Sequence, residues 1–318
     1  MNPARRAVID VGTNSVKLLV ADVRGTDVQP VLEDSAQTRL GQGFYETHLL
    51  QPDAIAQTAR AVKAFAAQAH ELHAQAIRVI ATSAARDAKN SYDLTNAIAA
   101  ASGLPTQIIS GDQEAEWAFA GVTSDARFAA SPLLLLDVGG GSTEFILGHE
   151  REIHFRRSFP LGTVRLLEKF PLSDPPTAAQ LAASRAWLAE FFRAEILPAL
   201  APAMQRETKL DPRHRQIRLV GTGGTATILA RMAAGLADFD RDRIESARLT
   251  LAAVRDRTAQ LWSLPLAERA TLPGLPRKRA DVILPGVLIF EAVLAELGLD
   301  ELAVSTRGLR FAVVSEAA

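Results

Sequence analysis

The sequence predicts an α/β protein built from two similar domains, and three observations lead to this expectation. Apolar β-forming runs alternate with helical patterns along the 318-residue chain, an arrangement typical of largely parallel sheets covered by helices. Asp10-Val-Gly-Thr-Asn-Ser15 recurs in altered form as Asp137-Val-Gly-Gly-Gly-Ser-Thr-Glu144, a domain-sized interval further along the chain. The length itself exceeds what one ordinary hydrophobic core contains, so two domains are expected.

In the first half of the chain, three expected strands precede an alternation of helices and strands. Gly12 and Gly25 separate the first strands, and the apolar spacing of Ile55, Ala59 and Val62 predicts a helix. The expected strands are 8–9, 16–23, 28–32, 77–81 and 106–109, and the expected helices are 55–72, 94–101 and 114–122.

The pattern restarts near Leu133, which predicts a second domain of the same kind. Its expected strands are 133–137, 144–147, 153–157 and 217–220, and its expected helices are 181–196, 226–233, 250–262 and 285–297. A Pro- and Arg-rich connection is expected after residue 196. The predicted domains are 1–128 and 129–302, with 303–318 expected to pack back on the first.

Composition and charge exclude several classes of protein. A 48% hydrophobic fraction with 22% charged residues is typical of a globular chain. No apolar run approaches the roughly 20 residues that span a bilayer, and the N-terminus lacks a signal-peptide pattern. No membrane partner is therefore expected, and the cytoplasm is the expected location. The net charge of −1 argues against general nucleic-acid binding.

The absence of cysteine rules out disulfides, thiolate nucleophiles and Cys-ligated metal sites. The six histidines are scattered in sequence; His70 and His73 share a helix face, but no acidic pair completes a metal site, so both are expected at a solvated surface. Positive charge is clustered at four places, which are either solvated surface or parts of a groove for an elongated anion. The clusters are Arg156-Arg157, Arg165 with Lys169, Arg213 to Arg218, and Arg277-Lys278-Arg279.

Each copy of the repeated motif places an aspartate and a turn rich in Gly, Ser or Thr after an apolar strand. The N–H groups of such a turn can face an anion, and the aspartate can hold a cation against it, so both copies are candidate phosphate sites. Three consecutive glycines at 139–141 strengthen the second copy because they permit very close backbone approach. An ordinary turn and a flexible hairpin tip are the alternatives for the first and second copy.

Carboxylates and one arginine supply the remaining candidate chemistry. Asp137 and Glu144 flank the glycine turn and suit Mg²⁺ or Mn²⁺ bridging to phosphate. Arg86 follows an expected strand end, where it either binds phosphoryl oxygens or pairs with Asp87 or another carboxylate. Glu114 opens an expected helix, where it either favours the helix dipole or acts as a general base.

Taken in order, these segments resemble the exopolyphosphatase / guanosine pentaphosphate phosphohydrolase (Ppx/GppA) family over nearly the whole chain. The matching motifs are Asp10 to Ser15, Ala81-Thr-Ser-Ala-Ala-Arg86, Ser110-Gly-Asp-Gln-Glu-Ala115, Asp137 to Glu144, Leu161-Gly-Thr-Val-Arg165, Gly221-Thr-Gly-Gly-Thr225, Arg279-Ala-Asp-Val-Ile-Leu-Pro-Gly286 and Gly308-Leu-Arg310. The resemblance implies a duplicated actin/hexokinase/Hsp70-like (ribonuclease H-like) two-domain fold, with the active site in the interdomain cleft.

The resemblance also implies roles for individual residues. Glu114 matches the family's catalytic glutamate, which activates the attacking water, although Gln113 stands where the family often has a second glutamate. Arg86 matches a ligand of the substrate phosphate. The resemblance places Asn14 and Ser15 in one phosphate loop, and Gly139, Gly140, Gly141 and Ser142 in the second. It places Asp137, with Glu144 and Asp10, at the metal. A third glycine loop, which lies near the nucleoside in nucleotide-binding relatives, comprises Gly221, Thr222, Gly223, Gly224 and Thr225.

The expected activity is Mg²⁺- or Mn²⁺-dependent hydrolysis of the terminal phosphoanhydride of inorganic polyphosphate, releasing orthophosphate. The alternatives are hydrolysis of guanosine pentaphosphate, an alarmone of the stringent response, a kinase or ATPase of the same fold, and a non-catalytic polyphosphate or alarmone sensor. The lack of any Gly-Lys dipeptide excludes a Walker-type P-loop. The chain ends at 318 without a His-Asp dipeptide, so it resembles the short two-domain members, and the resemblance suggests a homodimer.

Overall fold

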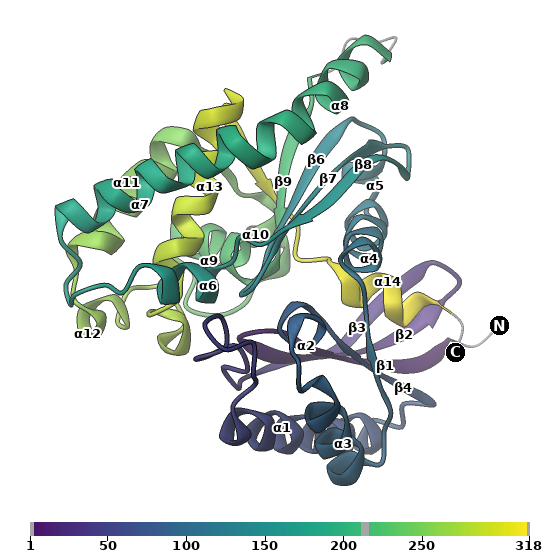
Figure 1. The fold of residues 1–318 in the computed structure, drawn as a ribbon. Coiled ribbons are helices and arrows are strands. Elements are labelled where there is room, and N and C mark those ends of the chain that lie inside the picture. Colours follow the sequence, from purple (N-terminus) through teal and green to yellow (C-terminus); the bar gives the residue numbers. More distant parts are fainter. Residues whose placement is uncertain (1–2, 211–215, 317–318) are drawn as a thin grey trace. The chain divides into compact units, whose positions relative to one another are not determined.

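The computed structural model describes residues 3–210 and 216–316, and Figure 1 shows the course of the chain. The chain divides into two compact units: unit 1 comprises Met1–Ser124 with Arg307–Ala318, and unit 2 comprises Asp125–Thr306. The limits expected from the sequence, 128/129 and 302/303, lie a few residues from these positions. The basic cluster at Arg213 to Arg218 falls partly outside the described residues.

Unit 1 contains a five-stranded sheet in the order β3-β2-β1-β4-β5. β1 and β3 both pair antiparallel with β2, whereas β4 is parallel to β1 and β5 is parallel to β4. This pairing brings the carboxyl ends of β1, β4 and β5 to one edge of the sheet. The strands are β1 (Ala4–Val11), β2 (Ser15–Arg24), β3 (Asp27–Gln37), β4 (Ala76–Ala81) and β5 (Thr106–Ile108).

Both faces of this sheet are buried because successive apolar residues of its strands point to opposite sides. Ile9 and Leu18 pack with α1 (Pro52–Glu71) and α3 (Ser91–Ser102). Val8 and Leu19 pack on the other face with α4 (Gly111–Thr123) and α14 (Leu309–Ser315), and Figure 1 shows the two pairs of helices on opposite sides of the strands. The short helix α2 (Ser83–Asp87) follows β4 almost directly.

Helix α14 packs onto unit 1 through buried side chains and through its backbone. Arg6 of β1 donates from Nη1 to the carbonyls of residues 314–316 at 3.4, 3.2 and 2.8 Å, at the helix end whose carbonyls lack intrahelical partners. Gly121 of α4 meets Gly308 so closely that a Cβ on Gly121 would lie 2.1 Å from the Gly308 carbonyl oxygen. Only glycine permits this approach, which sets the start of α14 against α4.

Unit 2 contains a six-stranded sheet in the order β10-β11-β9-β6-β7-β8. β6 to β8 form an antiparallel meander, β9 is parallel to β6 and to β11, and β10 adds an antiparallel edge. The strands are β6 (Leu133–Val138), β7 (Thr143–His149), β8 (Glu152–Phe159), β9 (Arg218–Thr222), β10 (Arg248–Thr250) and β11 (Glu301–Val304).

The two sheets share one topology. The order β8-β7-β6-β9-β11 in unit 2 repeats the order β3-β2-β1-β4-β5 in unit 1, with the same strand directions. In both units the first strand of the meander is also the one that carries the repeated aspartate motif. The duplication seen in the sequence is therefore a duplication of the fold.

The four helices predicted for unit 2 correspond to α7 with the π-helical turn after it, α9, α11 and α13, whereas α5, α6, α8, α10 and α12 were not predicted. The helices are α5 (Ala126–Ala129), α6 (Thr163–Lys169), α7 (Ala178–Phe191), α8 (Leu197–Leu210), α9 (Gly223–Ala233), α10 (Arg241–Ser246), α11 (Leu251–Ser263), α12 (Leu266–Arg269), a 3-10 turn (Arg277–Arg279) and α13 (Ile283–Leu297). The connection expected after residue 196 is instead α8, which continues α7 through a π-helical turn (Phe192–Ile196). Pro202 removes one backbone donor inside α8, but Leu200 and Ala203 beside it are buried in the core, and this packing maintains the helix.

Among the described residues, no helix has the length and apolar character needed to cross a bilayer.

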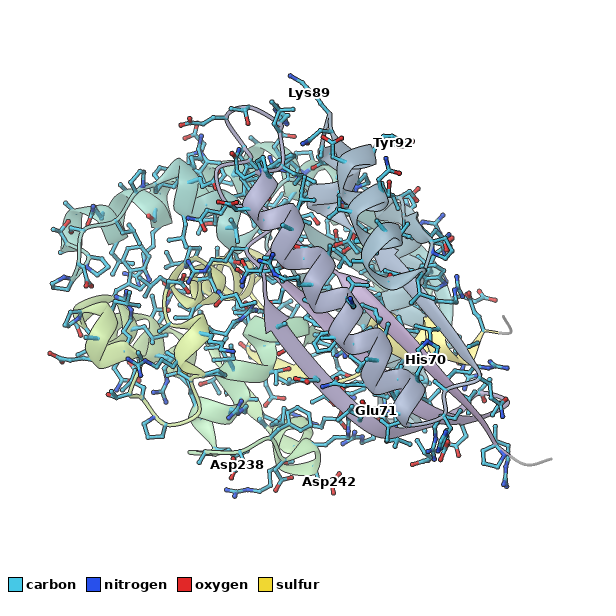
Figure 2. All side chains as sticks on the ribbon, turned by 90° about the horizontal axis from the view of Figure 1, so that it is seen from below. His70, Glu71, Lys89, Tyr92, Asp238 and Asp242 are labelled. Atoms are coloured by element: carbon cyan, nitrogen blue, oxygen red, sulfur yellow. The ribbon has the colours of Figure 1, made fainter. Side chains whose placement is uncertain are left out.

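The packing of α14 gives a prediction about stability. Phe311 is 2% exposed in the core shared by α4 and the sheet, so Phe311→Ala should lower the free energy of unfolding by about 3–5 kcal/mol. Urea denaturation followed by circular dichroism measures this change. Tyr92→Ala is the matched control, because this ring is 73% exposed and lies at the surface in Figure 2; its effect should stay within about 0.5 kcal/mol. Equal effects of the two substitutions would contradict the packing.

Candidate active site

We call the two candidate phosphate sites the first and second phosphate turns; the first lies between β1 and β2, and backbone hydrogen bonds fix its shape. The Gly12 N–H donates to the Ser15 carbonyl at 3.1 Å. From the segment after β3, the N–H groups of Thr38 and Arg39 both donate to the Asn14 carbonyl, at 3.1 and 3.0 Å. The segment that follows β3 therefore holds the turn from one side.

Asp10 is a buried carboxylate just before this turn. It is 5% exposed, and its Oδ1 has no hydrogen-bond partner among the described residues. Burial raises the pKa of Asp10, while the charges of Lys17 and Arg310 act in the opposite direction. A buried carboxylate oxygen without a donor suits a divalent cation, because Mg²⁺ and Mn²⁺ take oxygen ligands. Asp10 therefore fits the metal role that the sequence suggested.

Arg86 and Glu114 meet at the same edge of the sheet. Arg86 lies in α2 after β4, and Glu114 lies in the first turn of α4, whose N-cap Ser110 accepts a hydrogen bond from the Gln113 N–H at 3.1 Å. Arg86 Nη1 donates to Glu114 Oε2 at 2.9 Å and to the Ile109 carbonyl at 3.3 Å.

The sequence left open which carboxylate pairs with Arg86. In the structure, Glu114 lies closer to the guanidinium than Asp87 does. Arg86 Nε lies 3.7 Å from Asp87 Oδ1, farther than the hydrogen-bonded contact with Glu114. The Glu114 residue is 7% exposed, so little water surrounds it, and the hydrogen bond from Arg86 orients its carboxylate. This arrangement joins the two groups that the sequence treated separately.

The second phosphate turn, between β6 and β7, closes with the same backbone bond as the first. The Gly139 N–H donates to the Ser142 carbonyl at 2.9 Å. The N–H groups at the start of α6 hold the glycines: Thr163 donates to the Gly139 carbonyl at 3.0 Å and Val164 to the Gly140 carbonyl at 2.8 Å. A helix N-terminus therefore supports this turn.

The motif from Leu161 to Arg165 forms the start of α6 that contacts the second phosphate turn. A Cβ on Gly162 would lie 2.4 Å from the Gly140 carbonyl oxygen, so only glycine fits there. Arg165 donates from Nε to the Gly141 carbonyl at 2.8 Å. The sequence grouped Arg165 with residues that could line an anion groove, and the structure gives it a place beside the glycine turn.

Asp137 and Glu144 lie opposite each other across β6 and β7, so their side chains share a face of the sheet. Glu144 is 1% exposed, and its Oε1 accepts hydrogen bonds from Ser142 Oγ at 2.8 Å and Ser158 Oγ at 2.7 Å. Asp137 is only partly buried. Asp137 is thus the more accessible carboxylate, while Glu144 also orients the serine of the turn.

The third glycine segment is a strand-to-helix junction rather than an extended loop. Gly221 and Thr222 end β9, while Gly223, Gly224 and Thr225 form the first turn of α9. Gly223 has a φ of +83°, and a Cβ there would lie 2.6 Å from Asp137 Oδ1. The segment therefore lies against the Asp137 carboxylate of the second turn.

An arginine from the last basic cluster completes this junction. A Cβ on Gly224 would lie 2.3 Å from Arg279 Nη2, so the guanidinium packs on the glycine backbone. Burial lowers the pKa of Arg279, and the charge of Asp281 opposes that shift. A partly buried cation beside a helix N-terminus is suited to an anionic ligand.

Each unit thus gathers one set of the predicted groups. Unit 1 brings together the first turn, Asp10, Arg86 and Glu114 at one sheet edge, and unit 2 brings together the second turn, Asp137, Glu144 and the third glycine segment.

Sequence reasoning missed Ser158, which no periodicity marks, and the polar residue Thr38 after β3. The hydroxyls of Thr38 and Ser83 are buried without a hydrogen-bond partner among the described residues, at the edge that carries the first turn.

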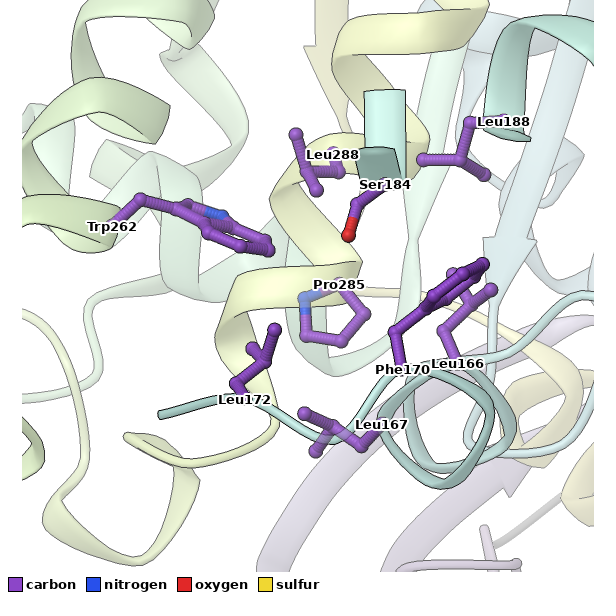
Figure 3. Close-up of a pocket in the computed structure, with 9 residues that line it drawn as sticks. All are labelled: Leu166, Leu167, Phe170, Leu172, Ser184, Leu188, Trp262, Pro285 and Leu288. Atoms are coloured by element: carbon purple, nitrogen blue, oxygen red, sulfur yellow. The ribbon is translucent and has the colours of Figure 1, made fainter. Parts of the chain in front are cut away.

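A small cavity in unit 2 lies apart from these groups. Figure 3 shows it between α6, α7, α11 and α13, with a volume of about 10 Å³. Its lining is apolar except for Ser184, and it includes Trp262 and Pro285. A space of this size holds at most about one water molecule, so it is a packing void of the core and not a phosphate site.

The fold is that of a duplicated α/β protein whose grouped turns and carboxylates suit a phosphate ligand, and comparisons with known proteins give its family. The model of the Ppx/GppA phosphatase family matches residues 19–317. The chain is 35% identical to Exopolyphosphatase 2 of Mycobacterium tuberculosis over 315 residues, which cover 95% of this chain and 94% of that protein.

Solved structures agree with this assignment. A Ppx/GppA family member from Aquifex aeolicus has a TM-score of 0.77 at 28% identity, covering 98% of this chain and 96% of the other. An exopolyphosphatase from Cytophaga hutchinsonii has a TM-score of 0.83 at 26% identity, covering 97% and 96%.

The chain belongs to the Ppx/GppA phosphatase family. The predicted duplicated two-domain α/β fold of the actin type is confirmed, and so is the prediction of an enzyme that hydrolyses a phosphoanhydride. The roles of individual site residues stay predictions.

The buried carboxylate of Asp10 leads to a prediction about stability and pH. Because the pKa of Asp10 is raised in the fold, its contribution to stability is full below the unfolded pKa and is lost as the pH rises through the folded pKa. Asp10→Asn removes the charge at nearly constant volume. Without divalent metal and at alkaline pH, the variant should therefore have a higher thermal midpoint than the parent protein.

Two further measurements define this experiment. At acidic pH, where the parent carboxyl is protonated, the difference in thermal midpoint should shrink. Added Mg²⁺ should raise the midpoint of the parent more than that of Asp10→Asn. A variant that is less stable than the parent at alkaline pH in chelator would show that the Asp10 charge is compensated within the protein.

Proposed function

We propose that the protein is an exopolyphosphatase, which hydrolyses the terminal phosphoanhydride of inorganic polyphosphate and releases orthophosphate. The observation that carries this proposal is the buried Glu114 carboxylate, oriented by Arg86 at the sheet edge that also holds the first phosphate turn. A fixed carboxylate beside a phosphate turn suits activation of water. The exopolyphosphatase name of the 35% identical relative supports polyphosphate as the substrate.

Glu114 would align the attacking water and accept its proton as the water oxygen bonds to the terminal phosphorus. The bond to the bridging oxygen breaks, and the shortened polyphosphate leaves with that oxygen. Phosphoryl transfer requires mainly positioning and charge stabilisation from the protein. A guanidinium carries five N–H donors, so Arg86 can orient Glu114 and also reach a phosphoryl oxygen.

The two turns would bind the phosphate chain through their backbone. Gly139, Gly140 and Gly141 with Ser142 would orient phosphate at the second turn, and Asn14 and Ser15 would bind phosphate at the first turn. Asp137, Glu144 and Asp10 would hold Mg²⁺ or Mn²⁺, which when bound offsets the charge of the phosphates.

Guanosine pentaphosphate is the second candidate substrate, and one feature favours it. The junction of Gly221, Thr222, Gly223, Gly224 and Thr225 matches the family segment that lies near the nucleoside in nucleotide-binding relatives, and Arg279 packs directly on it. A non-catalytic sensor would need neither Glu114 nor its arginine partner. A homodimer and a cytoplasmic location stay predictions from the sequence.

Glu114→Gln tests the general base. The amide keeps the shape of the side chain but cannot accept the water proton, so kcat for phosphate release from polyphosphate with Mg²⁺ should fall roughly 100- to 10,000-fold, with little change in KM. Glu116→Gln is the matched control, because Glu116 lies on the same helix and accepts a hydrogen bond from Gln113 Nε2 at 3.2 Å. Undiminished turnover by Glu114→Gln would remove this residue from the role of base.

The choice of substrate needs a direct comparison. Specificity constants for short-chain polyphosphate and for guanosine pentaphosphate should be measured on the same preparation, and polyphosphate should give the larger value. The reverse order would make the protein an alarmone phosphatase. Tight binding of either compound without turnover, with Mg²⁺ or Mn²⁺ present, would favour the sensor.

A further inference from the structure

Three ligand-bearing side chains of unit 2 converge at a place that the proposed phosphatase chemistry does not use. His149 ends β7, His154 lies in β8, and Glu207 lies in α8. Their ligand atoms all lie within 4.8 Å of one another. We call these residues the His-His-Glu cluster. The sequence did not connect them, because the part of the chain around Glu207 was expected to be irregular.

The carboxylate at the centre of the cluster is buried and faces two imidazoles. The Glu207 residue is 1% exposed, whereas the side chains of His149 and His154 are 22% and 28% exposed. Nδ1 of His149 contacts Glu207 Oε1, and Nδ1 of His154 contacts Oε2. In the described part of the chain these imidazoles are the partners of Glu207. A buried carboxylate is costly unless it is hydrogen-bonded or paired with a cation, and a cation held between these three groups would offset its charge.

The local backbone is irregular at the residue that completes the cluster. Gly148 pairs with Ile153 and Leu147 pairs with Phe155, so His154 is the extra residue of a β-bulge. Bulges redirect a side chain relative to a regular strand. The His154 ring meets the His149 ring edge-on, with centroids 4.9 Å apart and planes at 86°. The bulge thus turns a second imidazole toward the same carboxylate.

The other nitrogen of His154 supports metal ligation through Nδ1. Its Nε2 lies 3.8 Å from Oε2 of the exposed Glu152. When Nδ1 binds a metal, the ring proton stays on Nε2 and faces this carboxylate. A carboxylate on the far side of a ligating imidazole is a common feature of metal sites, because it helps to orient the ring.

We propose that the His-His-Glu cluster binds one divalent transition-metal ion, with Zn²⁺ as the best fit. Two imidazole nitrogens and one carboxylate form a ligand set that zinc accepts, with water in the fourth position. Ligands at about 2.0–2.1 Å from a tetrahedral ion lie about 3.3 Å apart, within the 4.8 Å spread of these atoms. Mg²⁺ fits poorly here because it prefers an octahedron of oxygens. The bound ion would fasten α8 to the β7–β8 hairpin.

Zinc titration of the full chain tests this site. The protein is stripped with a chelator, dialysed into excess Mg²⁺ and titrated with Zn²⁺ against a colorimetric zinc indicator. The parent should bind one Zn²⁺ per chain, and His154→Gln and Glu207→Gln should each weaken that affinity by at least about 100-fold. Zn²⁺ should also raise the thermal midpoint of the parent and leave that of His154→Gln unchanged.

His70→Gln is the matched control, because His70 lies exposed near the end of α1, as Figure 2 shows, and belongs to no such cluster. It should bind Zn²⁺ like the parent. If Glu207→Gln does not fold, His154→Gln tests metal binding instead, because this ligand is partly exposed. The visible absorption of bound Co²⁺ in the parent protein separately reports ligation by nitrogen. Absence of Zn²⁺ binding, or equal affinity in parent, His154→Gln and control, would overturn the proposal and leave the imidazoles as hydrogen-bond donors to Glu207.

Discussion

Both units depend on one backbone constraint, a strand that turns back almost at once after an aspartate. The bond from the Gly12 N–H to the Ser15 carbonyl in unit 1 has the same form as the bond from Gly139 to Ser142 in unit 2. The tight turn makes the next strand antiparallel, and the other side of the first strand pairs with a parallel neighbour, β4 or β9. Carboxyl ends of parallel strands then meet beside the turn, where ligands of open α/β sheets usually bind. The candidate groups of each unit lie at that edge for this reason.

The sequence predicted the fold well because the periodic signals were strong and repeated. The apolar run of β1 is buried on both faces of the sheet, the helical spacing in α1 buries one face of that helix, and the repeated aspartate motif marked the duplication. The prediction was wrong where a local rule competed with packing. The prolines after residue 196 suggested a broken helix, but the buried Leu200 and Ala203 maintain α8. Contacts between distant segments, such as Ser158 with Glu144, leave no periodic trace and could not be predicted.

The two phosphate turns differ in what surrounds them, although their closing bonds are alike. The first is held by the chain after β3, and it leaves the Asp10 Oδ1 without a donor among the described residues. The second is held by the N-terminus of α6, and Gly162 permits backbone contact that any side chain would block. Close support from a helix N-terminus reduces the freedom of the three glycines, which are otherwise costly to order. Backbone hydrogen bonds from a neighbouring segment thus hold both turns, and a fixed set of backbone donors is what electrostatic stabilisation of a bound phosphate would require.

The pair of Arg86 and Glu114 is better explained by chemistry than by stability. Removing two charges from water costs several kcal/mol per ion, and their attraction recovers this only with excellent geometry, so an apolar pair of similar volume would serve the fold as well. One Arg86 nitrogen contacts both the Glu114 carboxylate and the Ile109 carbonyl, which fixes the guanidinium relative to β5 and α4 together. The carboxylate is thereby held in one orientation at a site with little water, as a general base requires. If Glu114 is the general base of the proposed reaction, the interaction with Arg86 is what sets the direction in which it accepts a proton.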